Sequence, residues 1–125
     1  CRYCANACPY SVKHFNWAAP HWPEEMIRMQ NPDVSVRSVG VIEKCTFCHH
    51  RLMKGEEQAR AEDRNLTEKD YRPACVQACP TTAMVFGNLD DPHSEVSRLS
   101  KNKRAFRLME ELGTEPKVIY LKEEK

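Results

Sequence analysis

The sequence contains no long hydrophobic run, no excess of charge of one sign and few large aliphatic residues. No stretch approaches the roughly 18 uncharged apolar residues that would span a bilayer. The 19 Lys and Arg residues are balanced by 18 Asp and Glu residues, whereas a nucleic-acid-binding surface requires a strong basic excess on one face. From these absences we expect neither a membrane-spanning helix in this chain nor a nucleic-acid partner.

The apolar content is too low for an ordinary hydrophobic core. Leu, Ile, Val and Phe make up only 23 of the 125 residues, or 18%, which is little for a chain that must stabilise itself by burial alone. Because the net charge is only +1, the composition is not typical of a disordered chain either. Something other than a large core should hold the fold together, and the seven cysteines are the obvious candidates.

Signatures of catalysis are scarce as well. The chain has only four glycines and no glycine-rich phosphate loop, and neither a pair of carboxylates nor a Ser/His/Asp set stands out. No signal peptide is visible, and residue 1 is a cysteine that already belongs to a motif. We therefore expect no substrate chemistry from this chain alone, and we expect it to be a piece of a longer polypeptide.

A short internal repeat organises the cysteines. The first group is Cys1-Arg-Tyr-Cys4-Ala-Asn-Ala-Cys8-Pro9; the second is Cys45-Thr-Phe-Cys48, a 26-residue spacer, and Cys75-Val-Gln-Ala-Cys79-Pro80. The two closings align at an offset of 71 residues, and each continues to a phenylalanine seven residues after its last cysteine. The repeat C-x-[NQ]-A-C-P-x5-F predicts two half-sites related by approximate two-fold symmetry.

Three chemistries compete for these cysteines. Disulfides fit poorly, because the odd count leaves one thiol over and Cys1, Cys4 and Cys8 are so close that each needs a distant partner. A structural zinc ion uses C-x2-C with a second distant pair, but it explains neither the repeat nor the proline after each closing cysteine. Iron–sulfur clusters explain both features, and we favour them over a zinc-stapled interaction module.

The spacing matches a known cluster-binding run. Bacterial two-cluster proteins use C-x2-C-x2-C-x3-C-P, in which the fourth cysteine ligates the other cluster. The first group is that run without its first cysteine, and the second group is the same run with the spacer inserted. The close thiolates wrap one corner of a cluster, and the proline fixes φ and turns the chain away. The predicted iron ligands are Cys1, Cys4, Cys8, Cys45, Cys48, Cys75 and Cys79.

The remaining sequence predicts short elements around these motifs. Segments rich in strand-forming residues predict strands at 39–42, 81–86 and 118–121. The highly charged segment 54–72 is interpreted as an exposed helix and loop inserted between the second and third cysteines of the split run. The predicted fold class is α+β and ferredoxin-like, with clusters in place of a hydrophobic core.

Capping residues predict helices near the C-terminus. Asp91 and Pro92 indicate the start of one helix, and Asn102 indicates the start of a second, which Gly113 ends. Residues 91–121 are therefore interpreted as a helical extension. Among the remaining candidates, we interpret the following as surface or packing residues rather than ligands: His14, Trp17, His21, Trp22, His49, His50 and the basic run 101–104.

The motifs resemble those of four-cluster ferredoxin-type electron-transfer subunits of the molybdopterin oxidoreductase superfamily. The nearest family is the iron–sulfur subunit of alternative complex III, a quinol-oxidising respiratory complex. The stretches that carry the resemblance are Arg2 to Tyr10, Phe15 to Trp17, Asn31 to Arg37, Glu43 to Cys48, Pro73 to Pro80, Leu108 to Thr114, and Tyr120 with Leu121. The resemblance covers nearly the whole chain, and its cysteine motifs are specific to the superfamily.

The resemblance implies [4Fe–4S] clusters and a nested sharing of ligands. Residues 1–125 would be the C-terminal half of a four-cluster domain. In the nested arrangement Cys45, Cys48 and Cys75 share a cluster with a cysteine outside the chain, while Cys79 and Cys8 each serve a further cluster and Cys1 and Cys4 share another. A two-cluster ferredoxin instead lets Cys8 complete the set of Cys45, Cys48 and Cys75, and lets Cys79 join Cys1 and Cys4. We favour the nested arrangement.

The resemblance also allows for one [3Fe–4S] cluster, which alternative complex III typically carries. Every run position visible here holds cysteine, so no three-iron site is assigned.

The resemblance also implies partners and a location. Electrons would pass from an integral membrane quinol-binding subunit through the clusters to haem c subunits, with the remainder of the iron–sulfur subunit completing the ligand sets. The alternative is an electron-transfer subunit of a terminal reductase for polysulfide, nitrite or a similar acceptor. In either role the chain would be a peripheral part of a membrane complex, and the resemblance suggests the periplasmic face.

Overall fold

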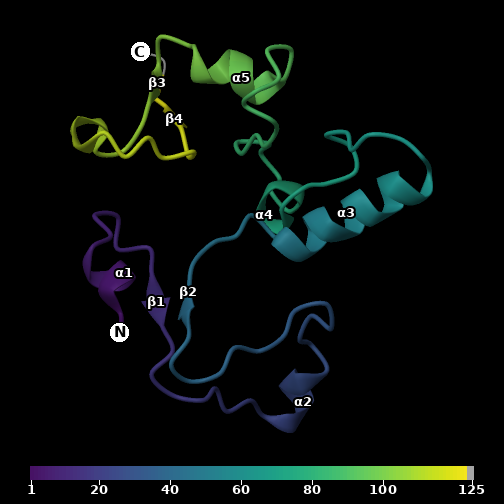
Figure 1. Cartoon of the computed structure of the whole chain (residues 1–125), viewed down its shortest axis with the longest axis vertical. Helices are drawn as coiled ribbons and strands as arrows, with labels where there is room; N and C mark the ends of the chain where they lie inside the picture. The colour runs from purple at the N-terminus through teal and green to yellow at the C-terminus, as the bar shows by residue number, and fades with distance from the viewer. Residues whose placement is uncertain (124–125) are drawn as a thin grey trace.

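The computed structural model describes residues 1–123, and its elements are short (Figure 1). Within these residues, the helix His49–Ala61 is the only one longer than two turns. In chain order the elements are α1 (Tyr3–Asn6), β1 (His14–Phe15), α2 (Glu24–Ile27), β2 (Ile42–Glu43), α3 (His49–Ala61), α4 (Ala74–Gln77), α5 (Glu95–Ser100), β3 (Ala105–Phe106), the 3-10 helix η1 (Glu110–Leu112) and β4 (Tyr120–Leu121).

Two antiparallel strand pairs hold distant segments together. In the first, β1 pairs with β2 in the register His14↔Glu43 and Phe15↔Ile42, and the Asn16 N–H extends the ladder to the Val41 carbonyl at 2.9 Å. Because β1 follows the first cysteine group and β2 precedes the second, this pair joins the two groups. The second pair, β3 with β4, closes the C-terminal segment at the top of Figure 1.

The buried residues outside α5 and its N-cap lie in α3 and in the segment that returns from it. Gly55 and Ala59 are the buried residues of α3, and Tyr71 and Pro73 are buried in the segment that returns from it. A Cβ atom on Gly55 would lie 3.0 Å from the Asp70 carbonyl oxygen, so this glycine permits a close approach of two backbones. The interpretation of 54–72 as an exposed helix and loop is therefore wrong in part, because its inner face forms the small core.

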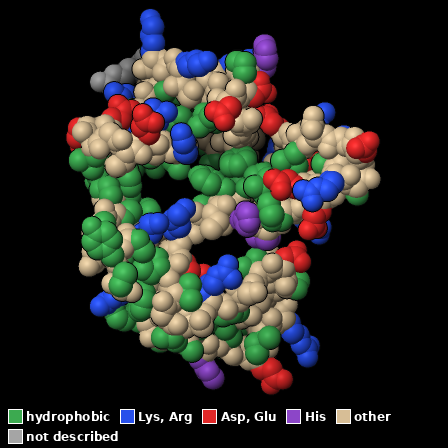
Figure 2. Space-filling model, in the orientation of Figure 1, with side chains coloured by type: hydrophobic (Ala, Val, Ile, Leu, Met, Phe, Trp, Pro, Cys, Tyr) green, Lys and Arg blue, Asp and Glu red, His purple; other side chains and the backbone are tan. Residues whose placement is uncertain are grey.

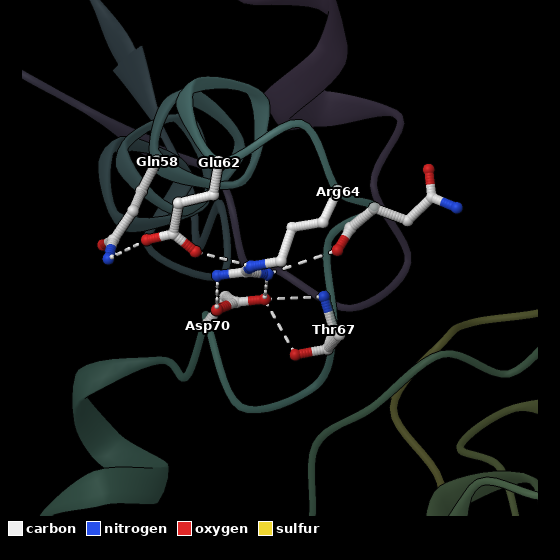
Figure 3. Close-up of polar contacts among 6 residues, drawn as sticks. Gln58, Glu62, Arg64, Thr67 and Asp70 are labelled. Atoms are coloured by element: carbon white, nitrogen blue, oxygen red, sulfur yellow. Dashed lines mark hydrogen bonds and ion pairs between the residues drawn. The ribbon is translucent and has the colours of Figure 1, made fainter.

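A polar network shapes the turn by which the insertion returns (Figure 3). The Arg64 guanidinium donates to both carboxylate oxygens of Asp70, at 2.7 and 2.8 Å, and the Thr67 N–H donates to the same carboxylate at 2.7 Å. These hydrogen bonds, led by that of Arg64, hold the pKa of Asp70 well below its usual range. Glu62 accepts from Gln58 and from Arg64, which ties the turn to the last turn of α3.

The C-terminal segment differs from the predicted helical extension. The helix there is α5, whose N-cap is Ser94, with its side chain accepting from the Ser97 N–H; Asp91 instead accepts from the His93 N–H in the preceding turn. The predicted second helix is wrong, because the Asn102 side chain accepts from the Arg104 N–H and the chain then enters β3. Only η1 is helical beyond that point in the described residues, and Gly113 ends it at φ +63°.

The strand predictions are confirmed only in part. Residues 118–121 contain β4, and residues 39–42 end in β2. Residues 81–86 form no strand in the described chain, because this segment turns around the closing cysteine and has no partner strand.

The described chain does not fill its own middle. Figure 2 shows a hollow between the C-terminal segment at the top and the N-terminal half below.

No helix within residues 1–123 has the length and apolar character needed to cross a membrane.

Candidate iron–sulfur site

All seven predicted ligands are free thiols at accessible positions. Cys8, Cys48 and Cys79 are half-buried, whereas Cys1, Cys4, Cys45 and Cys75 are exposed. Each lies in or beside a short helix or turn rather than inside a core. Their sulfurs are therefore open to ligands from outside the chain.

The sequence repeat is also a repeat of local backbone conformation. α1 and α4 occupy equivalent positions 71 residues apart, and each is followed by an alanine in the right-handed helical region, Ala7 at φ −82° and Ala78 at φ −85°. Three residues after each closing cysteine stands a residue of positive φ, Ser11 at 52° and Thr82 at 51°. The N–H of each donates to the cysteine carbonyl, at 3.3 and 3.4 Å. A two-fold relation between whole half-sites stays a prediction.

These turns direct hydrogen-bond donors at the closing sulfurs. The backbone N–H groups of Val12, Tyr10 and Ser11 lower the pKa of the Cys8 thiol, because they stabilise its thiolate. The pKa of Cys79 is also lowered, first by the Thr81 hydroxyl and then by backbone N–H groups that include that of Ala83. Both sulfurs are thus prepared to carry negative charge, which is the state in which cysteine ligates a metal.

The residues on either side of the insertion lie together in space, as they would if the insertion were absent. The Phe47 N–H lies 3.4 Å from the sulfur of Cys45, two residues earlier. The Ala74 N–H lies at the same distance, 3.4 Å, from the sulfur of Cys48. If residues 49–72 were removed, Ala74 would stand two residues after Cys48. The insertion therefore returns the chain to the point from which it departed, and Cys75 follows Cys48 as in a continuous run.

An aromatic cluster lies beside this run. The Tyr71 ring packs edge-on against Phe86 with centroids 5.1 Å apart, and Phe86 contacts Phe47 at 5.7 Å. Burial raises the pKa of Tyr71, and the negative charges of Cys48, Cys45 and Cys75 raise it further. The thiols of the split run are therefore near enough to Tyr71 to affect the ionisation of its hydroxyl.

Arg51 joins the two helices that carry the split run. Its guanidinium donates to the Gln77 side-chain oxygen at 2.6 Å and to the Arg72 carbonyl at 3.2 Å. Arg51 lies in the first turn of α3 and Gln77 is the last residue of α4. Gln77 is also the carboxamide of the repeat, so a residue singled out by the sequence pattern has a positioning role that the pattern alone did not indicate.

The counterpart aromatic, Phe15, has different neighbours. It packs against Trp17 with centroids 4.6 Å apart, and the Arg2 guanidinium lies 4.5 Å from the Trp17 ring. Trp17 remains 68% exposed. His49 is exposed and His50 half-buried in the first turn of α3.

The donor set fits an iron–sulfur cluster. Within residues 1–123 no three His, Cys, Asp or Glu side chains lie close enough to hold a single metal ion. A cluster places different demands on its ligands, because each thiolate binds a separate iron and the inorganic core lies between them. The accessible thiols of the split run, with backbone N–H groups 3.4 Å from the sulfurs of Cys45 and Cys48, are suited to that kind of binding. Which cysteines share a cluster stays a prediction.

Comparison with known proteins gives the class to which this chain is similar. No family model matches the chain. The chain is similar to iron–sulfur subunits of oxidoreductases, which confirms the resemblance at the level of iron–sulfur subunits. The four-cluster type stays a prediction. The specific assignment to alternative complex III stays a prediction.

Three relatives illustrate the similarity. The chain is 52% identical to the iron–sulfur cluster-binding subunit of menaquinone reductase from Nitratidesulfovibrio vulgaris, covering 97% of this chain and 49% of that protein. It is 42% identical to iron–sulfur subunit 1 of the Hdr-like menaquinol oxidoreductase of Archaeoglobus fulgidus, over 98% of this chain and 42% of the relative. It is 37% identical to the arsenate respiratory reductase subunit ArrB of Shewanella sp., over 98% and 58%. The chain thus spans about half the length of the relatives it matches.

Proposed function

We propose that this chain holds iron–sulfur clusters through its seven cysteines and conducts electrons between partners of an oxidoreductase complex. One observation carries the proposal: the Ala74 N–H faces the Cys48 sulfur as the Phe47 N–H faces that of Cys45. Twenty-four intervening residues would have no reason to return to this position unless Cys48 and Cys75 act together. The names of the relatives supply the cofactor class.

The clusters are proposed to be of the [4Fe–4S] type in a ferredoxin-like fold. When bound, they supply one-electron redox chemistry, and the chain's own residues hold them, shield them and set their environment. Cys45, Cys48 and Cys75 share one cluster. Cys79 and Cys8 reach away from their own runs to other clusters, as the fourth cysteine of such runs does.

The proposed path runs from a quinol-oxidising membrane subunit to haem c or another acceptor, at the periplasmic face of the complex. The menaquinone- and menaquinol-linked relatives support the quinone end of this path. The arsenate and selenate reductase relatives support the second candidate, an electron-transfer subunit of a terminal reductase. In both roles the chain transfers electrons and transforms no substrate itself.

The first test is the cofactor itself. Full-length protein purified without oxygen should be brown, contain iron and acid-labile sulfide in about equal amounts, and lose its broad visible absorption on reduction with dithionite. A colourless protein with stoichiometric zinc would overturn the proposal in favour of a zinc-stapled module. The subunits that co-purify separate the two candidate roles: haem c subunits support the first, and an active molybdopterin subunit supports the second.

A further inference from the structure

The two turns that follow the closing cysteines differ in one hydroxyl. Cys8-Pro9-Tyr10 and Cys79-Pro80-Thr81 are equivalent in the repeat, and the pKa of each closing cysteine is lowered by three backbone N–H groups. The backbone therefore supplies similar hydrogen bonds to both sulfurs. The side chains two residues after the cysteines, Tyr10 and Thr81, make different contacts.

The Thr81 hydroxyl lies at its cysteine. Its oxygen is 3.5 Å from the Cys79 sulfur. A ligating thiolate has no proton to give, so in a cluster the Thr81 hydroxyl is the donor and the sulfur is the acceptor. The threonine is held in place by the turn, because the Thr82 hydroxyl donates to the Thr81 carbonyl at 2.7 Å.

The tyrosine hydroxyl in the equivalent position points elsewhere. It donates to the Leu108 carbonyl at 3.4 Å and contacts the Thr114 hydroxyl, both of which belong to the C-terminal segment. Cys8 therefore receives backbone donors but no side-chain hydroxyl among those that lower its pKa. The local backbone is repeated, while the polar side-chain contact to sulfur is made at one site only.

Such a contact changes the redox equilibrium of a cluster. Reduction adds one electron to the cluster and its thiolates, with no bond formed or broken. The added negative charge strengthens every hydrogen bond that a sulfur accepts, so the donor stabilises the reduced form more than the oxidised form. A hydroxyl at one of two otherwise similar ligands therefore raises the potential of one cluster only.

We infer that Thr81 is a positioning residue for electron flow: its hydroxyl raises the reduction potential of the cluster to which Cys79 is bound. This inference rests on the proposed function and adds to it a residue that makes one cluster a better electron acceptor. It holds whichever cluster takes Cys79, because the contact is to the ligand sulfur.

The test is a redox titration of the anaerobically purified, full-length holoprotein, followed by electron paramagnetic resonance. Thr81→Val keeps the branched shape and removes the hydroxyl. We expect one cluster to shift to a more negative potential, with its ratio of reduced to oxidised form at a fixed potential falling by up to about tenfold, or about 59 mV. Thr81→Ser retains the hydroxyl and should restore the original potential.

The matched control removes a hydroxyl from the equivalent turn. Tyr10→Phe should leave every cluster potential unchanged, because the Tyr10 hydroxyl contacts the C-terminal segment and not a sulfur. Equal potentials in wild type and Thr81→Val would overturn the inference, as would a shift of the same size in Tyr10→Phe. If neither Thr81→Val nor Thr81→Ala retains iron, Thr81 is required for cluster assembly and its assignment as a tuning residue is wrong.

The inference and the proposed function fail in different ways. Absence of iron and sulfide from the wild-type holoprotein contradicts the proposed function itself. Intact clusters with unchanged potentials in Thr81→Val contradict only the assignment of Thr81.

Discussion

At the scale of single residues, hydrogen-bond donors face or stabilise the sulfurs of four of the proposed ligands. An N–H group lies 3.4 Å from the sulfur of Cys45 and of Cys48, and backbone N–H groups lower the pKa values of Cys8 and Cys79. Such groups stabilise thiolates whether or not they belong to one cluster. The grouping of the ligands must therefore be tested by substitution.

We predict that Cys48→Ser and Cys75→Ser abolish the same cluster signal, because the insertion brings both residues into one continuous run. The measurement is electron paramagnetic resonance of the reduced holoprotein, with iron counted per chain. Cys79→Ser is the matched comparison from the same helix and turn, and it should affect a different signal. Loss of different signals from Cys48→Ser and Cys75→Ser would contradict the shared site.

A second prediction concerns Gly55, where helix propensity and packing oppose each other. Alanine is favoured over glycine inside a helix by about 1 kcal/mol, yet a Cβ atom here would meet the Asp70 carbonyl at 3.0 Å and the Leu66 side chain at 3.3 Å. Because the first contact is with backbone, the returning segment must shift, at a cost of about 1–3 kcal/mol. Gly55→Ala should therefore lower the free energy of unfolding, measured by urea titration of the holoprotein.

The control for this substitution is Glu57→Ala, an exposed position on the same helix. It changes helix propensity without adding volume against the returning segment, so it should leave the unfolding free energy within about 0.5 kcal/mol of wild type. A Gly55→Ala protein more stable than wild type would show that the insertion does not pack on α3 as described.

At the scale of elements, the charged insertion acts as a structural arm. α3 carries the chain away from Cys48, the turn around Asp70 reverses it, and Tyr71 and Pro73 return it to α4. Its charge had suggested a solvated surface. The charged side chains of this segment are mostly exposed, whereas Gly55 and Ala59 are buried and Gly55 closely approaches the Asp70 carbonyl oxygen.

The ion pair in this arm predicts a dependence on pH. The folded-state pKa of Asp70 lies below its usual value, which is about 3.9 in an unfolded chain. The stabilisation is therefore fully present above about pH 5, and it is lost progressively as the pH falls through the unfolded-state value towards the lower folded-state value. Hydrogen exchange across residues 62–70 should stay constant between neutral pH and about pH 5 after correction for intrinsic rates, and rise below that.

The matched variant is Asp70→Asn, which keeps the shape of the side chain but has no charge. Its exchange rates should already be raised at neutral pH and should approach those of wild type in acid. Equal rates in the two proteins at neutral pH would show that the Arg64–Asp70 pair does not hold the turn.

At the scale of the whole molecule, a few long-range contacts replace a continuous core. β1 and β2 join the two cysteine groups, Arg51 joins α3 to α4, and Tyr10 joins the first closing turn to the C-terminal segment. The hollowed middle in Figure 2 is consistent with a fold that is held together by a few long-range contacts. Loss of one such contact should therefore loosen a whole segment.

We predict that Tyr10→Phe increases hydrogen exchange in residues 104–116, because the hydroxyl that reaches Leu108 and Thr114 is lost. The measurement is exchange followed by mass spectrometry, compared with Tyr3→Phe as a control. Tyr3 is 76% exposed and should show no effect. Unchanged exchange in Tyr10→Phe would mean that the strand pair β3–β4 holds the segment without the tyrosine.

The sequence by itself determined the repeat and pointed to the class of cofactor, because metal ligation needs particular side chains at short fixed spacings. The seven ligand residues stay a prediction of that pattern. The repeat of local conformation around Cys8 and Cys79 followed directly from it, since a C-P turn is set by residues within a few positions of one another.

Only the tertiary structure decided what the longer segments do. The helix predicted from Asn102 became a strand because β3 has a partner in β4, and the strand predicted at 81–86 did not form where no partner strand exists. The segment that returns from α3 packs against Gly55, whose nearest contact is the Asp70 carbonyl oxygen fifteen residues further along the chain. Pairing and close packing join positions far apart in the chain, and local propensity contains no information about them.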